Sequence, residues 1–341
     1  MFGNNYALSL LKKIAPPFLS TPSSSREYPP ENLYSLARKN DVSLTYLENI
    51  PENHEYKNSV YKYHLRHFRK LKKTILRVST LLEKNNIKYA VIKTLRPFPE
   101  DASDIDIINL GMEKDFIKII RILKRENYKS LGRGPYSAGF RSSLGIDLDI
   151  YNEISSNQII YMNKRNLHDQ VDRRKIQGNY INTLTPEADM LVISGHSAVK
   201  ENYTLSCFLT TLYRLKRETN KFIKNFLTLA DENDMNAVVR WFITLSAILC
   251  KRAYGAISKD LSIALNSLER LHPGAYRSYK NSRFPPYSID LLTLLEIFSE
   301  KVNCSVFRRS MCRQLRELTW PGKDLREGLI RKIPKWLGVT H

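Results

Sequence analysis

The spacing of apolar residues divides this chain into a helical start, a mixed middle and a helical end. Residues 31–49 and 56–85 carry apolar side chains at three- and four-residue steps, which predicts one amphipathic helix in each range. Asn85-Asn86 ends the second, longer helix. Its apolar face is formed by Val60, Tyr63, His67, Leu71, Ile75, Val78 and Leu82.

The middle of the chain mixes strand and helix patterns. Residues 88–93 and 104–110 read as strands joined by a proline-containing loop, and residues 112–126 read as a helix. Residues 136–151 predict a β-hairpin, and 180–184 a further strand. We therefore expect a mixed β-sheet with helices against it.

After the middle region the strand patterns stop. Thr185-Pro186-Glu187 is typical of a helix start, and the remainder predicts six or seven helices. The expected fold class is α+β, with a mixed-sheet core, flanking helices and an all-α C-terminal half. Four regions are predicted. Residues 1–33 are a segment with a Pro/Ser-rich loop, and residues 34–87 are a helical region. Residues 88–184 form the core, and residues 185–341 form a helical domain.

Two pairs of acids on predicted strands are the most informative chemistry in the chain. Asp104 and Asp106 alternate with isoleucines, so both carboxylates lie on one face of their strand. Asp147 and Asp149 repeat this pattern about forty residues later. Like charges this close raise the cost of ionising one another, and a divalent cation would offset that cost. An alternative interpretation, charges that protect a sheet edge from aggregation, does not explain the second pair.

The composition adds a strong positive charge. The 341 residues include 54 Lys and Arg against 34 Asp and Glu, a formal charge of +20. Residues 56–82 hold eight of the basic residues and no acid. Nucleic acid, nucleotide or an anionic membrane is the partner this favours; a generally basic surface without a polyanion partner is the alternative. The four cysteines form no CxxC pattern, so structural zinc is not predicted and a cytoplasmic location is expected. The longest apolar run, residues 241–250, is too short to span a membrane.

The acids and the order of elements together resemble the DNA polymerase beta-like nucleotidyltransferase superfamily. Asp104 and Asp106 match its paired acids, and Lys93-Thr94 stands ten positions earlier, where its small-residue loop begins. Ser-Asp-Ile-Asp, the lysine at position 93 and a later Pro186-Glu187 segment look most like the uncharacterised nucleotidyltransferase-like families of bacteria and archaea. The resemblance covers roughly residues 34–215.

The resemblance implies Mg²⁺-dependent chemistry, with Mn²⁺ as a substitute. Asp104, Asp106 and a third acid would hold two ions that clamp the attacking oxygen and the departing pyrophosphate. Asp147 matches the third, catalytic acid best, and Asp149 is its rival on the same face as a metal ligand. Carboxylate oxygens suit a hard cation of this kind.

The nucleotide site is less well matched. The family's usual Gly-Ser is replaced by Lys93 and Thr94, which offer an ammonium and a hydroxyl to the phosphates instead. Arg96 and Ser103 complete the expected nucleotide-binding residues. His196, on the first helix of the C-terminal half, either faces the site or, in the interpretation we favour, is a core histidine bonded to a backbone carbonyl.

Two functions follow. The first is transfer of a nucleoside monophosphate from a triphosphate such as ATP to a hydroxyl on RNA (for instance the end of a tRNA), on a protein or on a small molecule. The positive charge favours RNA, and it disfavours a cationic antibiotic as the acceptor. In a toxin-like version, the partner would be an antitoxin-like protein. The second is a catalytically lapsed nucleotidyltransferase fold that binds RNA or acts as a scaffold; the absence of Gly-Ser favours it. In either case no membrane partner is expected.

Overall fold

The computed structural model describes residues 2–19, 28–51, 55–100, 102–156, 158–199, 203–217, 219–282 and 284–319. Residues 20–27 of the predicted Pro/Ser-rich loop and residues 320–341 lie outside this range. Within it, a seven-stranded mixed sheet lies in the middle of the chain and eight helices follow it, which confirms the α+β fold class. The division into four regions, at residues 1–33, 34–87, 88–184 and 185–341, stays a prediction.

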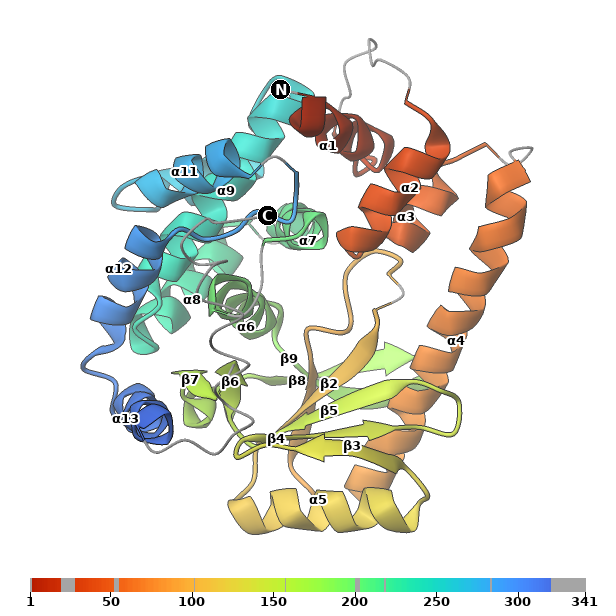
Figure 1. Cartoon of the computed structure of the whole chain (residues 1–341), viewed down its shortest axis with the longest axis vertical. Helices are drawn as coiled ribbons and strands as arrows, with labels where there is room; N and C mark the ends of the chain where they lie inside the picture. The colour runs from red at the N-terminus through yellow and green to blue at the C-terminus, as the bar shows by residue number, and fades with distance from the viewer. Residues whose placement is uncertain are drawn as a thin grey trace.

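Four helices precede the sheet: α1 (Phe2–Lys13), α2 (Pro30–Lys39), α3 (Ser43–Glu48) and α4 (Glu55–Lys84). The single helix expected over residues 31–49 is wrong, because Asp41 takes a left-handed conformation (φ 56°) that ends α2. The long helix that was predicted to begin at residue 56 is confirmed as α4. It runs the length of the sheet along one side of the molecule (Figure 1).

The central sheet has the strand order β3-β4-β5-β2-β1-β9-β8. Strand β2 runs antiparallel to β1 and parallel to β5, and β4 and β5 form the expected hairpin. A separate pair, β6 and β7, lies outside this sheet. The strands are β1 (Tyr89–Ile92), β2 (Asp104–Asn109), β3 (Lys129–Arg133), β4 (Ser137–Arg141), β5 (Asp147–Tyr151), β6 (Ile154–Ser156), β7 (Ile159–Met162), β8 (Val171–Ile176) and β9 (Asn179–Leu184).

The two faces of the sheet pack against different layers. Helices α4 and α5 (Glu113–Arg125) cover one face, where Ile105 and Ile107 of β2 join their buried side chains. Ile92 and Ile108 point to the opposite face and belong to a second core that continues through α1–α3 and the C-terminal helices. Because side chains alternate along β2, the acids at 104 and 106 also point towards this second layer.

The C-terminal half contains eight helices in the described part of the chain, one more than the larger number expected. Figure 1 shows them stacked beside the sheet. They are α6 (Pro186–Val199), α7 (Leu205–Arg217), α8 (Thr219–Glu232), α9 (Asn236–Tyr254), α10 (Lys259–Asn266), α11 (Pro273–Asn281), α12 (Leu291–Lys301) and α13 (Ser305–Thr319). Among the described residues, no helix has the length and apolar character needed to cross a membrane.

Candidate functional site

Adjacent parallel strands bring both acid pairs to one face of the sheet. In the register of β2 with β5, Asp104 lies beside Asp147 and Asp106 beside Asp149. The intervening Leu148 and Ile150 are buried in the α4–α5 layer, so all four acids project from the opposite face. This is the arrangement that the alternating sequence pattern predicted.

Three of the four carboxylates converge. Asp104, Asp106 and Asp149 each place one oxygen within 4.8 Å of the other two, and we call these three residues the acidic triad. Asp106 is buried, and the other two are half-buried. Of the two rivals for the third acid, the structure therefore brings Asp149 to the pair.

Asp147 is held elsewhere by its neighbour on β4. The Arg141 guanidinium donates two hydrogen bonds to the Asp147 carboxylate, one of them at 2.8 Å, and this contact lowers the pKa of Asp147. Opposite Asp149, by contrast, β4 carries Gly139, which has no side chain to hold a carboxylate. The structure thus groups Asp149, rather than the expected Asp147, with the pair, and the cause is the register of the β4–β5 hairpin. Which of the two acts as the third acid stays a prediction.

Lys93 lies directly against the triad. Its ammonium is 3.2 Å from an Asp106 oxygen, 3.5 Å from Nδ1 of His196 and 5.1 Å from the centre of the Tyr151 ring. His196 therefore faces the site rather than serving only as a core histidine. The backbone of Lys93 is left-handed (φ 54°), a conformation in which glycine is normally preferred. Strain of this kind concentrates at functional sites, where the surroundings must hold it in place.

A carboxylate from the C-terminal helices holds the strained turn at Lys93 in place. The Lys93 backbone N–H donates to Oδ1 of Asp189 on α6 at 2.7 Å, and Arg214 on α7 donates to the other oxygen of the same carboxylate at 3.0 Å. Asp189 thus links the end of β1 to two helices more than ninety residues away. The sequence analysis missed both Asp189 and Arg214, which carry no local motif.

The remaining expected nucleotide-binding residues have different roles in the structure. The Thr94 hydroxyl accepts from the backbone N–H of Asp106 at 2.9 Å and donates to the Ile92 carbonyl at 3.0 Å. It therefore joins the end of β1 to the backbone of β2. Arg96 is buried in its loop, 3.4 Å from Glu100. Ser103 is exposed and donates to Asp104 at 3.2 Å. Of the four, Lys93 and Ser103 contact triad carboxylates with their side chains.

The charges of the triad are costly without a cation. Burial, followed by the negative charge of Asp106, raises the pKa of Asp104 to about 7, although the Lys93 ammonium counteracts the shift. Burial and the charges of Asp106 and Asp149 likewise raise the pKa of the Tyr151 phenol. Three carboxylates whose oxygens lie within 4.8 Å of one another, one of them with its pKa raised to about 7, make a set of oxygen donors suited to a divalent cation such as Mg²⁺ or Mn²⁺.

A large cavity shares Asp189 with the contacts that fix the Lys93 turn. It has a volume of about 880 Å³ and lies between the β8–β9 hairpin and helices α6, α7 and α8. Asp189 and Arg214 form part of its wall, so the carboxylate that fixes the Lys93 turn also borders the cavity. Its volume falls within the range of small-molecule sites in proteins.

Comparison with known proteins yields weak similarities. No family model and no curated protein matches the chain. Among solved structures, the chain is similar to the lincosamide antibiotic adenylyltransferase LnuA bound to lincomycin, with 17% identity and a TM-score of 0.33 over 42% of this chain and 94% of the other. It is also similar to an antigenic nucleotidyltransferase-like protein from Paracoccidioides brasiliensis, with 13% identity and a TM-score of 0.33 over 50% and 92% of the two chains. Similarity at this level assigns neither family nor function.

Proposed function

We propose that this protein is a metal-dependent nucleotidyltransferase that moves a nucleoside monophosphate from a nucleoside triphosphate to an acceptor hydroxyl. The observation that carries the proposal is the acidic triad: three carboxylate oxygens within 4.8 Å of one another, with the pKa of Asp104 raised to about 7. A cluster that stores this much electrostatic repulsion has no structural advantage without a ligand.

Each residue of the site has a role in this proposal. Asp104, Asp106 and Asp149 would hold the divalent cation, Mg²⁺ or Mn²⁺. That cation would neutralise phosphate charge and lower the pKa of an attacking hydroxyl. The Lys93 ammonium, 3.2 Å from Asp106, is placed to contact a phosphate bound at the triad. Asp189 would act as a positioning residue, because its hydrogen bond holds the Lys93 turn.

Labelling with nucleotides tests the proposal. The protein would be incubated with each radiolabelled triphosphate, Mg²⁺ or Mn²⁺, and total RNA, and label transferred to any acceptor would be measured. We expect transfer with the parent chain and none with Asp104→Ala or Asp106→Ala. Asp169→Asn is the matched control, since this exposed acid lies outside the triad and should leave transfer unchanged. Equal transfer by the triad variants would contradict the proposal.

RNA is the acceptor that the +20 charge favours. The alternative, an RNA-binding or scaffold protein without catalysis, is favoured by one observation: the Thr94 hydroxyl donates its single proton to the Ile92 carbonyl, which leaves none for a phosphate. RNA binding without labelling under either metal would support that alternative. Label on a small molecule or on a protein, with none on RNA, would keep the transferase and reject the RNA acceptor.

A further inference from the structure

The outer face of α4 carries a regular row of positive charges. Five exposed cations, from Lys62 to Lys73, follow one another at one- to four-residue steps, and a sixth, Lys84, lies in the last turn of the helix. Arg77, exposed between Lys73 and Lys84, lies 3.4 Å from Glu126 and is not counted in the row. At 1.5 Å per residue, the distance from the first to the last is about 33 Å. We call this row the α4 stripe; its members are Lys62, Arg66, Arg69, Lys70, Lys73 and Lys84.

The packing of α4 against the sheet leaves the α4 stripe exposed to solvent. Leu71, Ile75, Val78 and Leu82 are fully buried against the sheet, so α4 has no apolar face left for another partner. A helix that lies in a membrane interface needs such a face, and the stripe is therefore better suited to a soluble polyanion. Tyr63, with 62% of its surface exposed, offers an aromatic ring beside the first cations of the row.

Strand β8 extends the positive surface around the edge of the sheet. Arg173 and Lys175 are exposed on it, and the Arg173 guanidinium lies 5.5 Å from the centre of the Tyr180 ring. Burial, and then the nearby charge of Arg174, lowers the pKa of Lys72 on α4. Cations of the two elements are thus close enough to repel one another, which a bound polyanion would relieve.

The same surface leads to the cavity that Asp189 lines. Arg173, Arg174 and Lys175 line the cavity of about 880 Å³ on one side, and Asp189 lines it on another. Asp189 in turn binds the backbone of Lys93, whose ammonium is 3.2 Å from Asp106. A strand that follows the charges from α4 across β8 therefore reaches a cavity that is connected to the triad through Asp189 and Lys93.

We propose that the α4 stripe and β8 bind the phosphate backbone of an RNA stem and direct its single-stranded end into the cavity. The role of that end as the acceptor rests on the proposed nucleotidyl transfer, whereas the binding itself does not. Contacts to phosphates through side chains on one straight helix read no bases, so the binding is expected to be independent of sequence and strongly dependent on salt. The exposed rings of Tyr63 and Tyr180 would stack on unpaired bases.

Fluorescence anisotropy with a labelled RNA hairpin tests the proposal. The hairpin would have a stem of about 16 base pairs and a single-stranded 3′ end. The test variant replaces four stripe residues with glutamine: Lys62, Arg66, Arg69 and Lys73. The control variant makes the same replacement at four exposed cations of the C-terminal half, and so removes the same charge: Lys251, Lys259, Lys280 and Arg308.

We expect the stripe variant to bind the hairpin at least about tenfold more weakly and the control within about twofold of the parent. The slope of log K against log salt should fall by about 3 in the stripe variant, because each phosphate contact contributes about 0.7 to 0.9. Thermal unfolding would show that both variants are folded. Equal losses in the two variants, or an unchanged slope, would overturn the proposal. So would a parent chain that ignores RNA but binds phosphatidylglycerol vesicles through the stripe.

Triad variants separate this inference from the proposed function. Asp104→Asn and Asp106→Asn should bind the hairpin as the parent does, since the triad lies on the other face of the sheet from α4. Hairpin binding through the stripe by a protein that transfers no nucleotide would end the proposed function and leave this inference intact. Transfer to a small acceptor by a protein that does not bind the hairpin would end this inference and leave the proposed function intact.

Discussion

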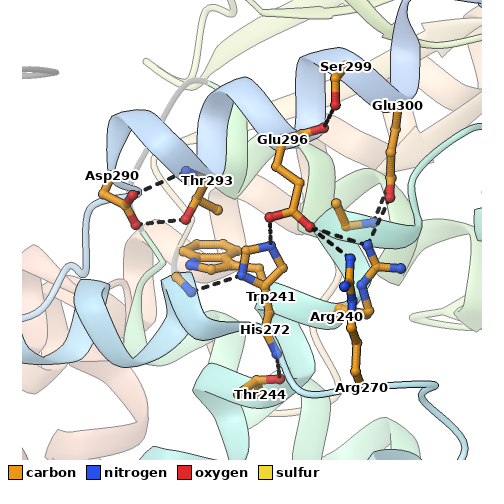
Figure 2. Close-up of polar contacts among 12 residues, drawn as sticks. Arg240, Trp241, Thr244, Arg270, His272, Asp290, Thr293, Glu296, Ser299 and Glu300 are labelled. Carbon is orange, nitrogen blue, oxygen red and sulfur yellow. Dashed lines mark hydrogen bonds and ion pairs between the residues drawn. The ribbon is translucent and has the colours of Figure 1, made fainter.

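Two polar clusters in this molecule contain three carboxylates each, and they differ in how those charges are matched. One is the acidic triad on the sheet. The other, which we call the helix network, lies between α9, α11 and α12 and contains Asp290, Glu296 and Glu300 (Figure 2).

Every acid of the helix network has a basic partner. Arg240 lies 2.9 Å from Glu300 and 3.5 Å from Glu296, while Arg277 lies 3.2 Å from Asp290. His272, almost fully buried, accepts the Gly274 N–H at Nδ1 and has Nε2 3.1 Å from Glu296. Burial lowers the pKa of His272, and the charge of the nearby Glu296 counteracts that shift. This cluster joins three helices by satisfying its own charges.

The acidic triad is arranged in the opposite way. Its carboxylates face one another, and the pKa of Asp104 rises to about 7 instead of falling as that of Asp290 does. A cation, the Lys93 ammonium 3.2 Å from Asp106, lies against the triad and only partly offsets the repulsion among the acids. The comparison teaches that matched charges indicate a structural role and concentrated like charges indicate a site for a ligand.

The largest effect should come from Asp149→Asn. If the triad acts as proposed, nucleotidyl transfer falls on the order of a thousandfold, while Asp147→Asn lowers it less than about tenfold because Arg141 already holds that carboxylate away from the triad. Single-turnover rates with the labelled triphosphate measure both. Equal losses would show that the hairpin register does not select the third acid.

Breaking the helix network should mainly reduce stability. Arg240→Met leaves Glu296 and Glu300 without their shared guanidinium, and we expect the free energy of unfolding to fall by about 3 kcal/mol. Adding Glu300→Gln should restore part of it, since one uncompensated charge is removed. Urea unfolding of the single and double variants measures the difference. A loss of transfer activity without a loss of stability in Arg240→Met would contradict the structural role.

Removing a charge from the triad should increase stability, whereas breaking the helix network should decrease it. The pKa of Asp104 is about 7 in the folded chain and 3.8 as its ordinary value, so the folded state keeps a proton that the unfolded state loses between pH 4 and 7. The contribution of Asp104 to stability therefore decreases as the pH rises through that window and is constant above it.

Asp104→Asn removes this dependence. In metal-free solution near pH 8, it should unfold with a free energy about 2 kcal/mol higher than the parent, and the advantage should vanish towards pH 4. Chemical denaturation of both proteins at several pH values, with EDTA present, gives the difference. A variant less stable than the parent at pH 8 would mean that the carboxylate supports the fold.

The smallest effect concerns the strained turn. Lys93→Gly and Lys93→Ala both remove the ammonium, but only glycine adopts φ 54° without cost, so Lys93→Gly should be about 1 kcal/mol more stable than Lys93→Ala. Thermal unfolding of the pair measures it. If alanine proves as stable as glycine, the turn is not strained in solution. Both variants should lose transfer to a similar extent, because the missing charge is the same.

Local pattern was sufficient for the elements that carry the site. The three- and four-residue spacing of Leu71, Ile75, Val78 and Leu82 defined α4, and alternation defined β2 and the face of its two acids. Local pattern was insufficient in two places. The left-handed backbone of Asp41 divides the first predicted helix into two, and a spacing of apolar residues does not reveal such a break. Strand β8 was not predicted because its exposed, charged residues show no apolar alternation.

The sequence by itself determined that four carboxylates share one face of neighbouring strands, because side chains alternate along any strand. Only the tertiary structure decided which three meet. Gly139 lies opposite Asp149 and Arg141 opposite Asp147, a difference that arises from the pairing of β4 with β5. Likewise, Asp189 reaches Lys93 across ninety-six positions of the chain. Such contacts depend on how layers pack, and no local period along the chain records which distant side chains will face each other.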